Sequence, residues 1–272
     1  MIGKMKKEMI NFAMITVLAL AVSCNNKSKE TEQSVTSADT VTTIERHTHW
    51  NYEGETGPDH WSEMDKNDCG GKLQSPIDIV ETETDKFLKP IEFHYNQKTK
   101  IHDVINNGHT IQFDFEPGDY IVVNGEQYEL KQFHFHESAE HTIKGVRYPL
   151  EIHMVHKNKD GKFAVVSIMA QENKKSNETF EFLDQYLPTK TNDTVKVNND
   201  FNINKVLPQN KSYYTYWGSL TTPPCTESVQ WFIFKAPIEV SIKMITDLKK
   251  IMPLNNFRNV QELNGRKIKE SI

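Results

Sequence analysis

Short runs of alternating or β-branched apolar residues, separated by turn signals, recur along most of this chain. Residues 109–115 follow an Asn-Asn-Gly turn signal, residues 121–123 precede Asn-Gly, and residues 163–170 follow Lys-Asp-Gly. Each combination is typical of a strand beside a tight turn. Two other segments, 177–187 and 241–252, have helical spacing, and the second ends before a proline. The pattern predicts one α+β domain, dominated by a mostly antiparallel sheet with a few short helices.

The first 24 residues differ from the rest of the chain. A lysine-rich start precedes an apolar run over residues 9–22, which is too short to span a bilayer comfortably and ends in small residues. We interpret residues 1–24 as an export signal. The run leads to Cys24 through a segment that resembles a bacterial lipobox, so lipidation of Cys24 is one expectation and ordinary signal cleavage is the alternative. Either reading predicts an exported bacterial protein, periplasmic or anchored to a membrane as a lipoprotein.

Residues 25–46 form a polar stretch without any aromatic residue. Such a segment buries too little apolar surface to offset the entropy of ordering, so we expect a flexible tether before a domain at 47–272. Once Cys24 is removed or lipidated, two cysteines remain, Cys69 and Cys225. In an oxidising compartment they can pair, and the alternative is two buried free thiols.

Composition narrows the class of protein further. The 272 residues include 37% hydrophobic and 25% charged residues, which is ordinary for a folded globular domain. The formal net charge is −5, and the lysines are scattered and form no basic stripe. No segment could neutralise a run of phosphates, so nucleic acid is excluded as a partner.

The most informative segment is the predicted strand at 131–136. Side chains alternate across a strand, so Gln132, His134 and His136 share one face. Two imidazoles on one face can bind the same ligand, although His-x-His alone is weak evidence for a metal site.

A second predicted strand, 150–155, supplies a third imidazole. There the same alternation places Glu151 and His153 on one face. If the two strands pair, three histidines converge, and three neutral nitrogen ligands with an open fourth position suit catalytic Zn²⁺. Gln132 and Glu151 each lie two residues from a proposed ligand and could accept the ligand's other ring N–H.

A competing interpretation is a cupin barrel. His134 and His136, followed by Glu140, also match the first cupin metal motif, in which the glutamate would itself bind iron or manganese. Cupins carry a second Pro-x-Gly-x-x-His motif downstream, and this chain has none.

The two histidine strands, together with the Ser-Leu-Thr-Thr-Pro-Pro segment at 219–224, resemble the alpha-class carbonic anhydrases. The resemblance covers nearly the whole domain and includes further motifs in order: His49-Trp50-Asn51-Tyr52, Gly57-Pro58-Asp59-His60-Trp61, Gln74-Ser75-Pro76-Ile77-Asp78-Ile79, Asn106-Asn107-Gly108-His109 and Asn256-Phe257-Arg258. It implies a large twisted central sheet. The implied activity is reversible hydration of carbon dioxide to bicarbonate and a proton by zinc-bound hydroxide.

The same resemblance implies roles for individual residues. It makes zinc ligands of His134, His136 and His153, and places behind them Gln132, Glu151 and Asn256. It makes Glu140 the acceptor for Thr221, which in turn accepts from the hydroxide. It assigns the substrate-binding surface to Val155, Val165, Leu220, Thr221, Thr222, Val229 and Trp231. Cys69 and Cys225 match positions that pair in many extracellular and bacterial members.

His109 matches the residue that relays protons between the zinc site and solvent, because an imidazole titrates near neutral pH. Alternation within 109–115 puts it on the face of Ile111 and Phe113, so a bulge or bend would have to turn it into a polar cavity. A surface histidine at a hairpin end is the alternative. We interpret other histidines as structural or solvated, including His47, His60, His94, His102 and His156.

One position departs from the family. After the second ligand histidine many members carry Trp or a small residue, whereas this chain has Glu137, whose charge could slow bicarbonate release or raise the basicity of zinc-bound water. Two other functions stay open from the sequence: a non-catalytic binding module of the same fold, and a zinc esterase or other hydrolase. The sequence leaves both monomer and dimer possible.

Overall fold

The computed structural model describes residues 49–174 and 178–272. The predicted export signal at 1–24, the tether at 25–46, Cys24 and His47 lie outside these residues. Among the described residues, no helix is both long and apolar enough to cross a membrane.

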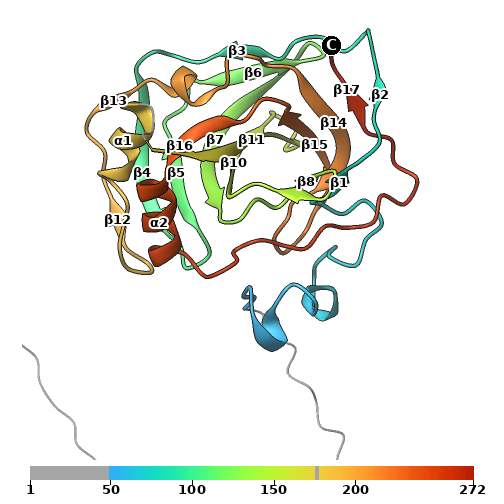
Figure 1. The fold of residues 1–272 in the computed structure, drawn as a ribbon, viewed down its shortest axis with the longest axis horizontal. Helices are drawn as coiled ribbons and strands as arrows, with labels where there is room; N and C mark the ends of the chain where they lie inside the picture. The colour runs from blue at the N-terminus through green and yellow to red at the C-terminus, as the bar shows by residue number, and fades with distance from the viewer. Residues whose placement is uncertain (1–48, 175–177) are drawn as a thin grey trace, which may run out of the picture. The chain divides into compact units, whose positions relative to one another are not determined.

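A 14-stranded sheet forms the centre of the described chain (Figure 1). Its main path runs β12-β4-β5-β7-β10-β11-β15-β14-β17-β2, with β3, β6, β13 and β16 attached beside it. Its strands are β2 (Glu83–Thr84), β3 (Glu92–His94), β4 (Thr99–Asn106), β5 (Ile111–Phe115), β6 (Tyr120–Val123), β7 (Glu126–His136), β10 (Leu150–Lys157), β11 (Phe163–Asn173), β12 (Thr194–Val195), β13 (Asp200–Phe201), β14 (Tyr213–Ser219), β15 (Glu227–Phe234), β16 (Ile238–Ser241) and β17 (Lys269–Glu270).

Smaller elements flank this sheet. A separate three-stranded sheet contains β1 (Asp78–Ile79), β8 (Thr142–Ile143) and β9 (Val146–Arg147). The helices of the described chain are α1 (Glu178–Asp184), α2 (Ile242–Ile251) and the short 3-10 turns Gly54–Thr56, Trp61–Glu63 and Ile203–Val206. The predicted sheet-dominated α+β class is confirmed.

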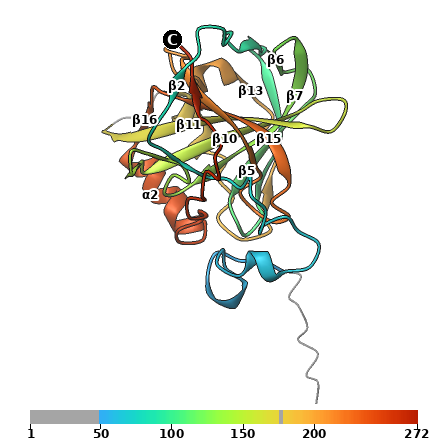
Figure 2. The same ribbon diagram turned by 90° about the vertical axis from the view of Figure 1, so that its right-hand side faces the viewer.

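Most neighbouring strands are antiparallel, as predicted, but the large sheet is mixed. Three of its pairings are parallel: β11 with β15, β11 with β16, and β17 with β2. The strand directions change progressively across the sheet, and this twist is visible when Figure 1 is compared with Figure 2.

Several predicted elements have different bounds. The strand expected at 109–115 begins only at Ile111, and the one expected at 163–170 continues to Asn173. The helix expected at 177–187 ends at Asp184, because the next two amides bond back three residues and tighten the chain into a turn. Helix α2 fits its prediction: the Ser241 hydroxyl accepts from the Met244 amide, which caps the helix start.

Alternation along the central strands divides the interior into two clusters. On β7 and β10, Phe133, Phe135, Ile152 and Met154 belong to the larger apolar cluster, which also includes buried residues of both helices. The residues that alternate with these apolar ones, including His134 and His153, face the opposite side of the sheet. That side holds the smaller apolar cluster around Trp231 and the candidate metal centre.

Candidate metal centre

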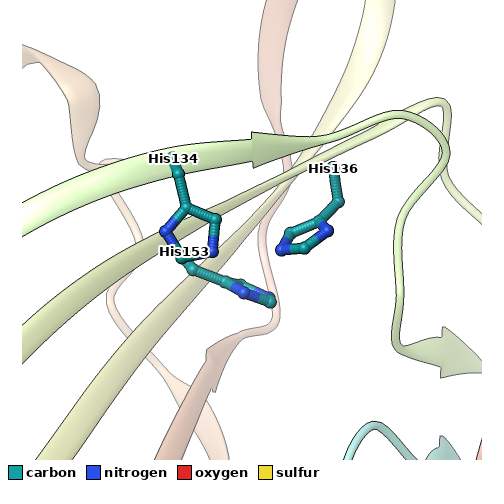
Figure 3. A group of neighbouring side chains, drawn as sticks. All are labelled: His134, His136 and His153. Atoms are coloured by element: carbon teal, nitrogen blue, oxygen red, sulfur yellow. The ribbon is translucent and has the colours of Figure 1, made fainter. Parts of the chain in front are cut away.

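Strands β7 and β10 are antiparallel neighbours, as the sequence analysis required. In their register His153 lies opposite His134, and Glu151 lies opposite His136. Facing positions on paired strands bring side chains of one face together. Figure 3 shows the three imidazoles turned toward one another, and each offers a ligand atom within 4.8 Å of the others.

Hydrogen bonds decide which ring nitrogen each histidine presents to this point. His134 Nδ1 donates to the Gln132 carboxamide oxygen at 2.8 Å, and His153 Nε2 donates to Glu151 Oε1 at 2.7 Å. His136 Nδ1 donates to the backbone carbonyl of Asn256 at 2.6 Å. The nitrogens left for a metal are therefore Nε2 of His134 and His136 and Nδ1 of His153.

Burial favours the neutral form of all three imidazoles. Burial lowers the pKa of His136 to about 4, and it also lowers the pKa of His134 and of His153. His136 Nε2 has no hydrogen-bond partner among the described residues, although it is fully buried. Neutral imidazoles with an unpartnered buried nitrogen fit a zinc ion, which needs deprotonated ligands.

The Glu151 carboxylate is saturated with donors. Oε1 accepts from His153, from His141 Nδ1 at 2.8 Å and from Ser167 Oγ at 2.6 Å. Oε2 accepts from the backbone amides of Glu140 and His141 at 2.7 and 2.8 Å. Burial alone would raise its pKa, but His141 and His153 outweigh burial and hold the pKa of Glu151 well below its usual range.

Glu140 lies beside the three histidines, with Oε2 3.5 Å from His136 Nε2. Its Oε1 accepts from the Arg258 backbone amide at 2.9 Å, and its carboxylate is hydrogen-bonded to Thr221. Burial raises the pKa of Glu140 to about 7, against the lowering effects of His153 and Thr221. The structure thus brings Glu140 and Thr221, 81 positions apart in sequence, to the same buried site.

His109 lines a cavity of about 110 Å³ together with His134, His136 and Thr222. The prediction that it belongs to a strand is wrong, because β5 starts two residues later. It sits in a turn in which Asn107 Oδ1 accepts from the amides of His109 and Thr110 at 2.9 Å each. No bulge is needed, since strand alternation does not govern a turn residue.

Two further contacts fix this histidine. Its ring stacks on Trp50, with centroids 3.7 Å apart and an interplanar angle of 15°. Its backbone carbonyl accepts from Asn256 Nδ2 at 3.1 Å. Burial, and secondarily the nearby His49, lower the pKa of His109.

The predicted substrate-binding residues divide between two surroundings. Thr222 lines the cavity of His109. The apolar residues lie in the smaller cluster, where the Trp231 ring centroid is 4.8 Å from that of His153. That cluster contains Val155, Val165, Val229 and Trp231, with Leu220 packed against it.

Cys69 and Cys225 form a disulfide, so the predicted pairing is confirmed and the free-thiol alternative is wrong. The bond lies in a small cluster with Tyr52 and Trp61, against which Trp50 packs. It joins the segment that carries Trp50 to the segment that follows Thr221 and Thr222.

The Glu137 side chain is buried, and it is absent from the lining of the His109 cavity. Its carboxylate accepts from Lys249 Nζ of helix α2 at 3.2 Å, and its amide donates to Asn256 Oδ1 at 2.7 Å. Lys249 therefore compensates the charge that distinguishes this chain beside His136.

Sequence reasoning gave no role to several residues that complete the site. His141, Tyr216 and Arg258 reach it from a loop, from β14 and from the C-terminal segment. None of them shares a strand face with the histidines, so alternation carried no signal for them. Arg258 belongs to the family motif at 256–258, and His141 follows Glu140 in the segment 138–142, which also resembles the family; these resemblances were the only available indication.

A single sheet-built unit with a buried, three-histidine centre defines a candidate metalloenzyme. A family model for eukaryotic-type carbonic anhydrase matches residues 56–272. A carbonic anhydrase of Pectobacterium carotovorum is 37% identical over 221 residues, which are 80% of this chain and 89% of that protein. One of Neisseria gonorrhoeae is 39% identical over 228 residues, 82% of this chain and 88% of that protein.

Solved structures agree. The alpha-carbonic anhydrase of Thermovibrio ammonificans, in complex with the inhibitor sulfanilamide, has a TM-score of 0.77 and 40% identity over 81% of this chain and 98% of its own. A hyperthermostable carbonic anhydrase from a hydrothermal vent chimney has the same TM-score and 43% identity, over 82% of this chain and 100% of its own. The chain belongs to the alpha-class carbonic anhydrases, zinc enzymes that hydrate carbon dioxide.

Proposed function

We propose that this chain hydrates carbon dioxide reversibly at a zinc ion held by His134, His136 and His153, with a hydroxide nucleophile and with His109 as proton relay. The observation that carries the proposal is the convergence of three buried imidazole nitrogens within 4.8 Å, each fixed by a hydrogen bond on its other ring nitrogen. Three protein ligands leave zinc a position for solvent, which distinguishes catalytic from structural sites.

Zinc bound there would act as a Lewis acid that makes hydroxide available at neutral pH. The chain's part is to hold the ligands still. The Gln132 amide, the Asn256 carbonyl and the Glu151 carboxylate each accept one ring N–H, which fixes the tautomer and orientation of the ligand.

Thr221 and Glu140 would select which groups can bind beside the metal. When Glu140 is ionised, its carboxylate only accepts hydrogen bonds, so the Thr221 hydroxyl donates its proton to Glu140, and its oxygen lone pairs are left to accept. A group beside the metal is then favoured only if it can donate a proton to Thr221. This orients a hydroxide for attack and disfavours anions that carry no proton.

Apolar residues next to the metal suit a small uncharged substrate. Val155, Val165 and Trp231 lie against the His153 side of the centre and offer carbon dioxide no hydrogen bond. The substrate would be held loosely, and the charged product would be poorly retained there.

His109 supports the proposed proton relay by position and by pKa. It lines the same cavity as two of the proposed ligands, so a short water path can connect them. A lowered pKa keeps the ring neutral at pH 7 and therefore ready to accept a proton.

The decisive experiment combines zinc content with stopped-flow measurement of the pH change after mixing with carbon dioxide. We expect one zinc per chain and rapid hydration in the parent protein, and loss of both in His134→Ala. His94→Ala is the matched control, because that exposed histidine lies outside the site. A metal-free but active parent protein, or a His134→Ala variant with full zinc content and activity, would refute the proposal, and ester turnover exceeding hydration would favour a hydrolase.

We further propose that the protein is exported and anchored through Cys24. The apolar run before Cys24 supports export, and the Cys69–Cys225 disulfide suits an oxidising compartment. Expression in a bacterium with labelled palmitate should label the parent chain and leave Cys24→Ala unlabelled and released from the membrane fraction. Equal fractionation of the two proteins would contradict anchoring.

A further inference from the structure

A chain of buried hydrogen bonds leads away from the metal centre behind His153. His141 Nδ1 bonds Glu151 Oε1 at 2.8 Å, and His141 Nε2 bonds the Tyr216 hydroxyl, also at 2.8 Å. Tyr216 in turn bonds Ser75 Oγ at 2.7 Å, which accepts from the Ser219 backbone amide at 3.0 Å. Every side chain along this path is buried.

The direction of each bond follows from its two fixed ends. The Glu151 carboxylate only accepts, so His141 must donate from Nδ1. In the neutral imidazole, Nε2 then carries a lone pair and accepts the Tyr216 proton.

At the other end, the Ser219 amide can only donate to Ser75 Oγ. The Ser75 hydroxyl proton is therefore directed to the Tyr216 oxygen. Each donor therefore has one acceptor, and every hydrogen bond in the series is donated in the direction from Ser219 to Glu151.

We propose that Tyr216 is a positioning residue of the metal centre, whose hydroxyl fixes His141 so that Glu151 holds His153 in its metal-binding orientation. The proposal rests on the proposed zinc function. It also links two parts of the site, because Ser219 lies two residues before Thr221.

The residues next to these hydrogen bonds leave room for them and reinforce them. A Cβ added at Gly218 would lie 2.1 Å from Ser75 Oγ and 2.8 Å from the Tyr216 ring. Only glycine at position 218 therefore leaves room for Ser75 to contact Tyr216 of β14. A second bond, from the Ser75 amide to Ser219 Oγ at 2.9 Å, locks the same two segments together. Burial raises the pKa of Tyr216, which keeps its hydroxyl a donor at all working pH values.

Hydrogen bonds in series strengthen one another in a low-dielectric interior. Without the Tyr216 hydroxyl, His141 becomes a weaker donor and is less firmly held, and Glu151 keeps more of its negative charge. A more electron-rich His153 would by itself bind zinc more tightly, but we expect its poorer orientation to outweigh this effect and to weaken zinc binding. The pH midpoint of kcat/KM should rise, because a more electron-rich His153 makes the zinc a weaker acid.

The test is Tyr216→Phe in the full chain, with Tyr214→Phe as matched control. Tyr214 lies on the same strand and the same face, and it packs against the same apolar cluster. Three quantities are measured: the zinc dissociation constant by chelator competition, the pH midpoint of kcat/KM, and the urea midpoint of the zinc-free protein. For Tyr216→Phe we expect a zinc dissociation constant about tenfold higher, at the lower end of effects seen for groups behind metal ligands, and an upward shift of the pH midpoint.

A zinc dissociation constant within twofold of the parent value, or an unchanged pH midpoint, would overturn the proposal even if the urea midpoint fell, because Tyr216 would then be merely structural. If Tyr216→Phe does not fold, Ser75→Ala removes the next group of the chain, and its pH midpoint must also rise. A parent protein that binds no zinc would refute the proposed function. A parent that binds zinc, with a Tyr216→Phe variant whose zinc dissociation constant and pH midpoint are unchanged, would refute only this inference.

Discussion

The disulfide permits the most quantitative prediction. Cys69 and Cys225 are 156 positions apart, so their bond closes a loop that covers more than half of the chain. Closing a loop of this length removes entropy from the unfolded chain worth about 5 kcal/mol at 25 °C in the chain-entropy treatment. Typical domains are stable by about 5–15 kcal/mol, so this one bond is a large part of the total.

Reduction should leave the folded site largely in place. The Asp68 amide donates to the Pro224 carbonyl at 2.8 Å, and Gln74 Nε2 donates to the Cys225 carbonyl at 3.3 Å, so other bonds hold the two segments together. We therefore expect hydration activity to persist in the folded, reduced protein. The loss should appear in the free energy of unfolding.

The assay is urea unfolding of zinc-loaded protein followed by tryptophan fluorescence, with and without a thiol reductant. We expect Cys69→Ala/Cys225→Ala and the reduced parent to lose about 5 kcal/mol. Cys24→Ala is the control, since it removes a cysteine outside the loop and should leave the free energy of unfolding unchanged. A loss below about 1 kcal/mol would show that loop entropy does not stabilise this fold.

Three further predictions concern single sites. His109→Ala should lower kcat by about tenfold to 100-fold in weak buffer while kcat/KM is kept, and added imidazole should restore kcat; an equal fall of both constants would contradict a relay. Glu137→Gln should leave the pH–rate midpoint unchanged and cost at most about 1 kcal/mol in urea unfolding, because half-exposed Lys249 already compensates the charge; a shifted midpoint would contradict this. His156 is buried against the Tyr95 hydroxyl, and burial lowers its pKa to about 3 from 6.5. Below pH 6.5 the unfolded chain therefore takes up a proton at His156 that the folded chain does not take up. The free energy of unfolding falls as pH drops from 6.5 toward 3. His156→Leu/Tyr95→Phe should thus lose about 2 kcal/mol less than the parent between pH 7 and pH 5, and equal losses would count against the assignment.

Local patterns were enough for the class of fold and for the centre of the site. Alternation depends only on neighbouring residues, so it placed His134 and His136 on one face and His153 on another strand before any pairing was known. The cysteine count raised a Cys69–Cys225 pair as one of two alternatives, and the structure decided for the pair. Helix α2 was predictable because its cap and its stopping proline lie within the segment itself.

Tertiary structure decided everything that depends on residues far apart in sequence. The acceptor for His136 is a backbone carbonyl 120 positions away, and no side-chain pattern can encode a carbonyl. The placement of His109 follows from a turn and from Asn256, and the parallel pairings of β11 depend on how distant strands meet. The hydrogen bonds of Tyr216 likewise exist only because a loop, β10 and β14 pack together in the interior, where each buried polar group must find its partner in space.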